Sequence, residues 1–190
     1  MRPWVWAVIV YHVASRLGYV LYVGAALARQ KRGAYFTSRW GVEGGFRRFR
    51  RVAAFFMNND AVSFILLCLA SRGTLQLELP RGPLLGVAVF LIVLGAGIKL
   101  WAAVILGAKA FYWYDFFAPP PPHPSTRGPY RLFRNPMYTV GYLHTYGLAL
   151  LLGSAPGLFA SLFDQLAILA FHRLVEDPHV KRWTPRGTLA

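Results

Sequence analysis

Side chains suited to binding an anion gather in residues 127–138, which read RGPYRLFRNPMY. Three arginines and two tyrosines lie there, immediately before an apolar run. Asn135 and Pro136 are favourable N-cap and first-turn residues, so a helix is expected to begin at this point. Backbone N–H groups at a helix N-terminus can bind an anion, and the helix dipole favours negative charge there. The segment therefore predicts a carboxylate or phosphate site.

A second group of candidate residues lies in residues 175–181, which read VEDPHVK. Glu176 is expected at the end of a helix, where the dipole disfavours a negative charge, so a cationic partner is predicted for it. Asp177 has two interpretations: it contacts a ligand, or it caps a short terminal helix that has Pro178 in its first turn. His179 adds a side chain that can act as a general base.

The elements that position these groups are predicted to be membrane-spanning helices. The chain has 190 residues, of which 56% are hydrophobic and 15% are charged. Its apolar regions are residues 3–28, 52–71, 83–117 and 136–175, compared with about 20 residues for one helical span. The last region is about two spans long and contains GSAPG at 153–157, which indicates a tight turn. We therefore predict an all-α polytopic bundle of about five transmembrane helices with a C-terminal helical hairpin, in a single membrane-embedded domain over residues 1–190.

Basic residues are distributed asymmetrically over the predicted loops. Most of the 21 lysines and arginines lie between the first two spans, between the third and fourth, or after the hairpin. Five crossings place these three segments on one side, which the positive-inside rule makes cytoplasmic. The predicted topology has the N-terminus outside and the C-terminus inside, and the first span is expected to be retained and not cleaved as a signal.

Disulfide, metal and nucleic-acid chemistry are not predicted. Cys68 is the single cysteine, which excludes an internal disulfide and a thiolate metal cluster. The five histidines lack a zinc-binding spacing such as HExxH. The net charge of +14 also suits nucleic acid, but arginines at the ends of membrane spans attract anionic headgroups without any further function.

Polar side chains inside the predicted spans are costly in lipid and need an explanation. His12 and Arg16 lie one turn apart in the first span, and later spans contain Asn58, Asn59, Asp60, Lys99 and Asp164. We predict interhelical pairing, such as Asp60 with Lys99 or Arg16.

Four segments, in order, resemble a known family of membrane methyltransferases. Residues 128–141 fit G-P-Y-R-x-x-R-[HN]-P-x-Y-x-x-G, which is similar to the signature shared by isoprenylcysteine carboxyl methyltransferase and the phosphatidylethanolamine N-methyltransferases. Residues 95–97 (GAG) resemble the G-x-G that the family pairs with two acidic residues to hold S-adenosylmethionine. Residues 112–117 (YWYDFF) and 175–181 resemble segments of the phospholipid branch. The resemblance covers about residues 83–183.

The resemblance implies a site for S-adenosyl-L-methionine as methyl donor and a phosphatidylethanolamine acceptor. Cofactor-binding residues implied by it are Gly95, Gly97, Arg134, Asn135, Pro136, Tyr138, Glu176 and Asp177. Candidate substrate-binding residues are Arg127, Tyr130, Arg131 and His144. Candidate catalytic residues are Asp115, Glu176 and His179. The acceptor amine must lose a proton, and the sequence leaves the base open among Glu176, His179, Asp115 and His144.

The implied reaction is methyl transfer to the amine of phosphatidylethanolamine or its mono- and dimethyl derivatives, in phosphatidylcholine synthesis. The active site is expected to face the cytoplasm, at the endoplasmic reticulum in a eukaryote or the inner membrane in a bacterium. Alternatives are an isoprenylcysteine carboxyl methyltransferase-like enzyme, a sterol-type reductase and a non-catalytic lipid-binding scaffold. The scaffold is motivated by departures from the family pattern, namely Asn135 where many members have histidine and Asp177 in place of glutamate.

Overall fold

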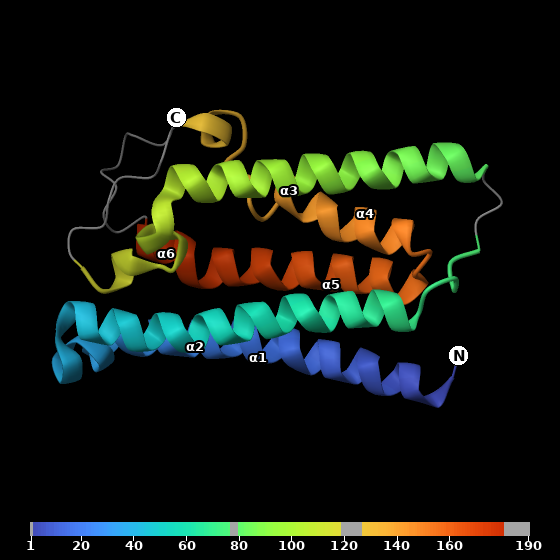
Figure 1. Ribbon diagram of the computed structural model, residues 1–190. Helices are drawn as coiled ribbons and strands as arrows, with labels where there is room; N and C mark the ends of the chain where they lie inside the picture. Colours follow the sequence, from blue (N-terminus) through green and yellow to red (C-terminus); the bar gives the residue numbers. More distant parts are fainter. Residues whose placement is uncertain (1, 77–79, 119–126, 181–190) are drawn as a thin grey trace.

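The computed structural model describes residues 2–76, 80–118 and 127–180, and every regular element in these ranges is a helix. Figure 1 shows an elongated bundle of helices that run roughly along one axis. The principal helices are α1 (Pro3–Gly33), α2 (Tyr35–Ala70), α3 (Arg81–Phe111), α4 (Leu143–Leu151) and α5 (Ala155–Phe171). Short elements are the 3-10 turns η1 (Tyr114–Phe116), η2 (Gly128–Arg131) and η3 (Val140–Tyr142), the π-helical turn η4 (His172–Glu176) and α6 (Asp177–Val180).

The predicted all-α membrane bundle is confirmed. Within the described ranges, four helical segments are long and apolar enough to cross a membrane: Pro3–Gly33, Tyr35–Ala70, Arg81–Phe116 and Ala155–Val180. The N-terminus and α6 lie at opposite ends of the bundle (Figure 1), as an odd number of crossings requires.

The fourth pass is shorter than the sequence indicated. Its helix does not begin at Pro136; α4 begins at Leu143 and has 9 residues, which rise about 14 Å against about 30 Å of hydrocarbon. The carbonyl of Asn135 accepts from the backbone N–H of Tyr138 and Thr139, but Thr139 then leaves helical geometry with φ −106° and ψ −93°. Asn135 is therefore not the cap of a regular helix, and the first half of this pass is a series of turns. Such backbone is tolerated at membrane depth where protein surrounds it.

Two helix pairs form the two sides of the bundle. In the first pair, α1 and α2 are joined at Ala34, which adopts a left-handed φ of 50°. The side chain of Gln30 fixes this turn, because its Oε1 accepts from the backbone N–H of Phe36 at 2.9 Å and of Thr37 at 3.3 Å. The arginine-rich stretch after this turn is helical, and it continues across a kink at Gly41, where φ is 66°.

The second pair, α3 and α4, is packed through glycine. A Cβ on Gly147 would lie 2.7 Å from the carbonyl oxygen of Ala88, and a Cβ on Gly95 would collide with the backbone of Leu143 and His144. Small residues at these positions let the two backbones approach closely, as is common in membrane helices.

The predicted hairpin between α4 and α5 is present. Gly153 turns the chain with φ 60°, and Ser154 caps α5 by accepting from the backbone N–H of Gly157 at 2.8 Å. The Ser154 hydroxyl also bonds the hydroxyl of Ser71 at 2.7 Å, which ties the turn to the end of α2. Helix α5 then runs between the two helix pairs (Figure 1).

Candidate active site

Glu176 is the centre of a polar cluster at the end of the bundle opposite the N-terminus. Its Oε1 accepts from Trp113 Nε1 at 2.5 Å and from the Tyr138 hydroxyl at 2.8 Å. Its Oε2 lies 2.5 Å from His172 Nδ1. The cationic partner predicted for Glu176 is thus a histidine, which carries a charge when protonated. Three donors from three segments hold one carboxylate in a fixed position.

A π-helical turn explains how one histidine reaches two acids. His172 Nδ1 contacts Glu176, and His172 Nε2 lies 3.1 Å from Asp177 Oδ1. In an α-helix the residues four and five positions on point about 100° apart. The wider π turn over His172–Glu176 brings both acids near the same ring, and such turns occur frequently at functional sites.

Arg134 approaches the same cluster from the signature segment. Its Nη2 lies 3.9 Å from Asp177 Oδ1, and its side chain is 73% exposed. This long contact at the surface contributes little to stability. The guanidinium is therefore accessible beside the Asp177 carboxylate.

Asp115 and His179 form a separate pair next to this cluster. His179 Nε2 lies 3.4 Å from Asp115 Oδ2, and its ring stacks on Phe116 with the ring centroids 3.7 Å apart. Both side chains are largely buried. An imidazole oriented by a carboxylate is an arrangement suited to proton transfer.

The signature segment wraps around the end of α3. Gly128 has a positive φ of 57°, and a Cβ there would lie 3.2 Å from Trp101 Nε1, so glycine is required by both backbone and space. The Tyr130 hydroxyl contacts Met137 Sδ at 3.5 Å. Burial, together with the negative charge of Glu176, raises the pKa of Tyr130. Arg131 is exposed and Pro136 is buried.

The two glycines of the GAG segment have different surroundings. Gly95 packs against the backbone of α4, whereas a Cβ on Gly97 would meet no described atom within 4 Å. They therefore do not share a packing face, as their spacing of two implied. Gly95 lies beneath His144, whose Nδ1 bonds the carbonyl of Gly141.

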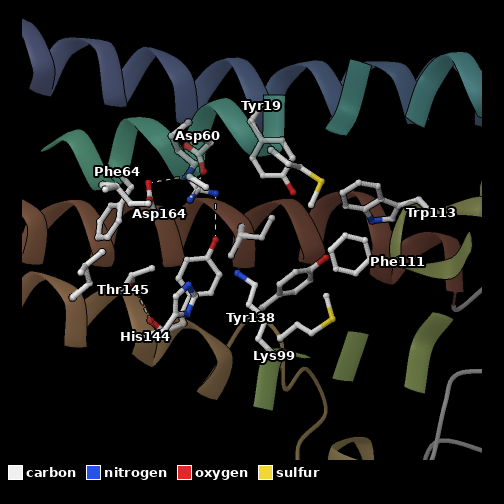
Figure 2. Close-up of a pocket in the computed structure, with 18 residues that line it drawn as sticks. Tyr19, Asp60, Phe64, Lys99, Phe111, Trp113, Tyr138, His144, Thr145 and Asp164 are labelled. Atoms are coloured by element: carbon white, nitrogen blue, oxygen red, sulfur yellow. Dashed lines mark hydrogen bonds and ion pairs between the residues drawn. The ribbon is translucent and has the colours of Figure 1, made fainter. Parts of the chain in front are cut away.

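A cavity of about 210 Å³ inside the bundle shares lining residues with the Glu176 cluster. Its outer end is lined by Phe111, Trp113 and Tyr138, and two of these residues hold Glu176. Figure 2 shows Tyr19 and Asp60 on one side of the cavity and Lys99 and Tyr138 on the other. His144 also lines it. The cavity therefore connects the acidic cluster to groups from both helix pairs.

The inner wall of the cavity carries a buried ion network centred on Arg16. Its Nη2 lies 2.7 Å from Asp60 Oδ2, and its Nε donates to Asp164 Oδ1 at 2.8 Å. Its Nη1 donates to the Tyr142 hydroxyl at 3.2 Å. The predicted pairing of Asp60 with Arg16 is confirmed. His12, Asp60 and Asp164 are close enough to hold a metal ion, but Arg16 already supplies a positive charge to both carboxylates.

Half of the predicted site residues lie in three places. Arg134, Tyr138, Glu176 and Asp177 lie in the first cluster together with Trp113. Trp113 belongs to the motif at residues 112–117 but was not predicted as a site residue. Asp115 and His179 form the second, and His144 lines the cavity. Gly97 is exposed on α3. His172 was not predicted, although its position four residues before Glu176 was a usable signal.

A polytopic helical membrane protein with an acidic and aromatic site at one end fits a membrane enzyme that acts on lipid. The family model described as phospholipid methyltransferase matches residues 84–183. The chain belongs to this phospholipid N-methyltransferase family. The match favours neither the isoprenylcysteine enzyme nor a scaffold.

Curated relatives carry the same family name. The phosphatidylethanolamine N-methyltransferase of Schizosaccharomyces pombe is 34% identical over 138 residues, covering 70% of this chain and 15% of the relative. That of Pyricularia oryzae is 32% identical over 136 residues, covering 70% of this chain and 14% of the relative. The chain thus spans about 14–15% of the length of these relatives. No solved structure matches the chain.

Proposed function

We propose that this protein transfers a methyl group from S-adenosylmethionine to the amine of phosphatidylethanolamine or its partly methylated derivatives, in phosphatidylcholine synthesis. The observation that carries the proposal is the position of Glu176. Its carboxylate is held by Trp113 and Tyr138, which line a cavity in the membrane bundle, and the chain's relatives are named for this activity. The donor is water-soluble and the acceptor is a lipid, so a site between the bundle end and its interior suits both.

The residues around Glu176 fit the chemical groups of S-adenosylmethionine. Its ammonium and ribose diol require acceptors, which the Glu176 and Asp177 carboxylates supply. Its own carboxylate requires a donor, which the exposed Arg134 guanidinium supplies. Aromatic rings such as Trp113 and Tyr138 stabilise a cation nearby. When bound, the cofactor supplies an activated methyl group. We also propose Gly95, Gly97, Asn135 and Pro136 as contacts of the cofactor.

His144 is the proposed base that takes a proton from the acceptor ammonium. Of the four candidate bases, His144 is the one that lines the cavity. Its Nδ1 bonds the carbonyl of Gly141, and a carbonyl can only accept, so Nδ1 carries the hydrogen. Nε2 is then the basic nitrogen. Glu176 is proposed to bind the cofactor, and the Asp115–His179 pair is proposed to support the cofactor end of the site.

The basic end of the bundle is proposed to face the cytoplasm. The C-terminal ends of α1, α3 and α5 and the N-terminal end of α2 lie together at the end opposite the N-terminus (Figure 1). The arginines of residues 29–51 belong to these helix ends, and such residues stay preferentially in the cytoplasm. Arg127 and Arg131, predicted as substrate-binding residues, are proposed to attract the anionic groups of lipid at the same surface. The membrane is the endoplasmic reticulum in a eukaryote or the inner membrane in a bacterium.

A transfer assay with methyl-labelled S-adenosylmethionine tests this function. The purified chain in nanodiscs is expected to label phosphatidylethanolamine, and Glu176→Gln is expected to lower the rate at least 100-fold. Glu43→Gln is the matched control, because Glu43 is an exposed acid that pairs with Lys109 on the surface. It should keep the wild-type rate within twofold. Folded wild-type protein that labels no aminophospholipid would contradict the proposal.

A further inference from the structure

The cavity reaches the lipid-facing surface of the bundle between α2 and α3. Ala61 and Ile65 both line it and both are exposed, and Ile65 retains 46% of its surface. Helix α2 packs mainly on α1 and α3 mainly on α4, so these two helices leave an approach between them. A ligand that enters beside Ala61 and Ile65 comes from the bilayer, because this part of α2 is within an apolar span.

The interior of the cavity contains an acceptor that no described residue satisfies. Asp60 is 6% exposed, and its Oδ2 binds Arg16 while its Oδ1 has no hydrogen-bond partner among the described residues. A buried carboxylate oxygen without a donor is costly, and this cost favours a ligand that brings one. Asp60 is one of the residues that line the cavity.

Charges of both signs face the same space. Lys99 lines the cavity from α3, with its Nζ 5.1 Å from the ring centroid of Tyr142. Arg16 adds a second cation and Asp164 a second carboxylate. The cavity is therefore close to neutral but strongly dipolar. A zwitterion, with an anion near Lys99 and a cation near Asp60, matches this distribution better than an ion of either sign.

The remaining walls suit a methylated ammonium. Tyr19, Phe64, Trp113, Tyr138 and Tyr142 contribute aromatic rings to the cavity, and such rings attract quaternary and partly methylated amines. The volume of about 210 Å³ is enough for several water molecules, so a small polar headgroup such as phosphoethanolamine fits in it.

We infer that this cavity is the binding site for the zwitterionic headgroup of a glycerophospholipid that enters from the bilayer past Ala61 and Ile65. Asp60 accepts from the headgroup ammonium, and Lys99 binds the phosphate. Asp60, Arg16 and the rim residues precede the segment that matches the family model, residues 84–183. The first two helices thus supply the contact with the ammonium and the entrance, and Lys99 of α3 supplies the contact with the phosphate. The inference rests on the proposed function, since it names the place where the acceptor amine is held.

A rim substitution tests the inference without touching the ion network. Ala61→Trp fills the entrance, and we expect the KM for phosphatidylethanolamine, as mole fraction in nanodiscs, to rise at least tenfold. The dissociation constant for S-adenosylmethionine, measured by calorimetry, should stay within twofold. Val62→Trp is the matched control, because Val62 is the next residue on α2, is 52% exposed and does not line the cavity. It should change neither value by more than twofold.

An interior substitution tests the headgroup contacts separately from turnover. Retention of phosphatidylethanolamine by detergent-purified protein is measured by native mass spectrometry, with phosphatidylglycerol for comparison. We expect Asp60→Asn to lose the preference for phosphatidylethanolamine and Lys99→Gln to weaken retention of both lipids at least fivefold. Circular dichroism verifies that each variant is folded; if Asp60→Asn is not, the Lys99 and Ala61 variants decide the test.

The outcomes separate this inference from the proposed function. In one outcome, wild-type protein retains phosphatidylethanolamine, the Lys99 and Ala61 variants weaken this retention, and no methyl group is transferred. That outcome would overturn the proposed function and keep the headgroup site. Variants that lose cofactor affinity while lipid retention is unchanged would show that the cofactor fills the cavity and overturn the inference. Unchanged lipid retention, lipid KM and cofactor affinity in the folded Ala61 and Lys99 variants would also overturn it, because the cavity would then hold neither ligand.

Discussion

At the scale of single residues, the site depends on how firmly Glu176 is held. The indole of Trp113, the hydroxyl of Tyr138 and the ring of His172 all contact its carboxylate. Hydrogen bonds to a charged group contribute about 1.5–3 kcal/mol each. The carboxylate is therefore oriented before a ligand arrives.

Removing one of these donors should weaken cofactor binding without unfolding the protein. We expect Tyr138→Phe to lower S-adenosylmethionine affinity about tenfold, since the loss of one hydrogen bond to a carboxylate is worth that factor. Isothermal titration calorimetry measures it. Tyr114→Phe is the control, because the Tyr114 hydroxyl bonds Glu43 on the surface. Equal affinity in both variants would show that Tyr138 does not position Glu176 for the cofactor.

The Arg16 network should be the costliest site to disrupt. Removing one partner of a buried ion pair costs about 3–5 kcal/mol, because the other charge stays buried. We expect Asp164→Asn to lower the free energy of unfolding by this amount in mixed detergent micelles. Lys109→Gln breaks the exposed pair with Glu43 and should change it little. Similar losses for the two variants would argue against an energetic role for burial.

Several of these residues could be found from the sequence and others could not. Glu176, Asp177 and Arg134 belong to recognisable patterns, and the structure brings them together. The pairing of Asp60 with Arg16 followed from the cost of charge inside a span. His172 was missed because its contact with two acids depends on a π turn, and apolar periodicity does not reveal helix type.

At the scale of elements, glycine sets the distance between α3 and α4. A Cβ on Gly95 would collide with the α4 backbone, whereas one on Gly97 would meet no described atom within 4 Å. We expect Gly95→Ala to lower the free energy of unfolding by about 1–3 kcal/mol through overpacking, and Gly97→Ala by less than about 0.5 kcal/mol.

Unfolding of both variants in the same detergent measures this difference. A fall in S-adenosylmethionine affinity in the folded Gly97→Ala variant would support the predicted cofactor contact there. Equal destabilisation by the two substitutions would contradict the packing described for α3 and α4.

Helix boundaries were predictable where local signals determine them. The turn at Gly153 and Ser154 was expected from GSAPG and is present. The predicted start of the fourth helix, Pro136, was wrong: the helix begins seven residues later, at Leu143. Asn135 and Pro136 carry favourable local signals, but Tyr138 and Tyr142 are directed to Glu176 and Arg16. Those tertiary contacts favour turns over a continuous helix.

In the molecule as a whole, the bundle places an acidic site at one end next to a mainly apolar cavity that carries buried charged groups. The cavity is lined by α1, α2, α3, α4 and α5 together, so neither the matched segment nor the first two helices form it alone. The apolar spans predicted the bundle from the sequence. The polar residues that line the cavity are far apart in the sequence, so their proximity could be seen only in the folded structure.

Orientation in the membrane has a direct test. Cysteines replace the exposed Arg39 and Arg72 one at a time in a Cys68→Ala background, and an impermeant maleimide is added to either side of sealed vesicles. We expect Arg39→Cys to react from the cytoplasmic side and Arg72→Cys from the opposite side. The reverse labelling pattern would place the Glu176 cluster outside the cytoplasm.

Calorimetric titration of S-adenosylmethionine into the purified chain, in nanodiscs that contain phosphatidylethanolamine, tests whether the Glu176 cluster binds the cofactor. Wild-type protein should bind the cofactor at a single site, and Glu176→Ala should lose at least 100-fold in affinity while it remains folded by circular dichroism. Absence of binding to folded wild-type protein, or unchanged binding to Glu176→Ala, would contradict a cofactor site built around Glu176.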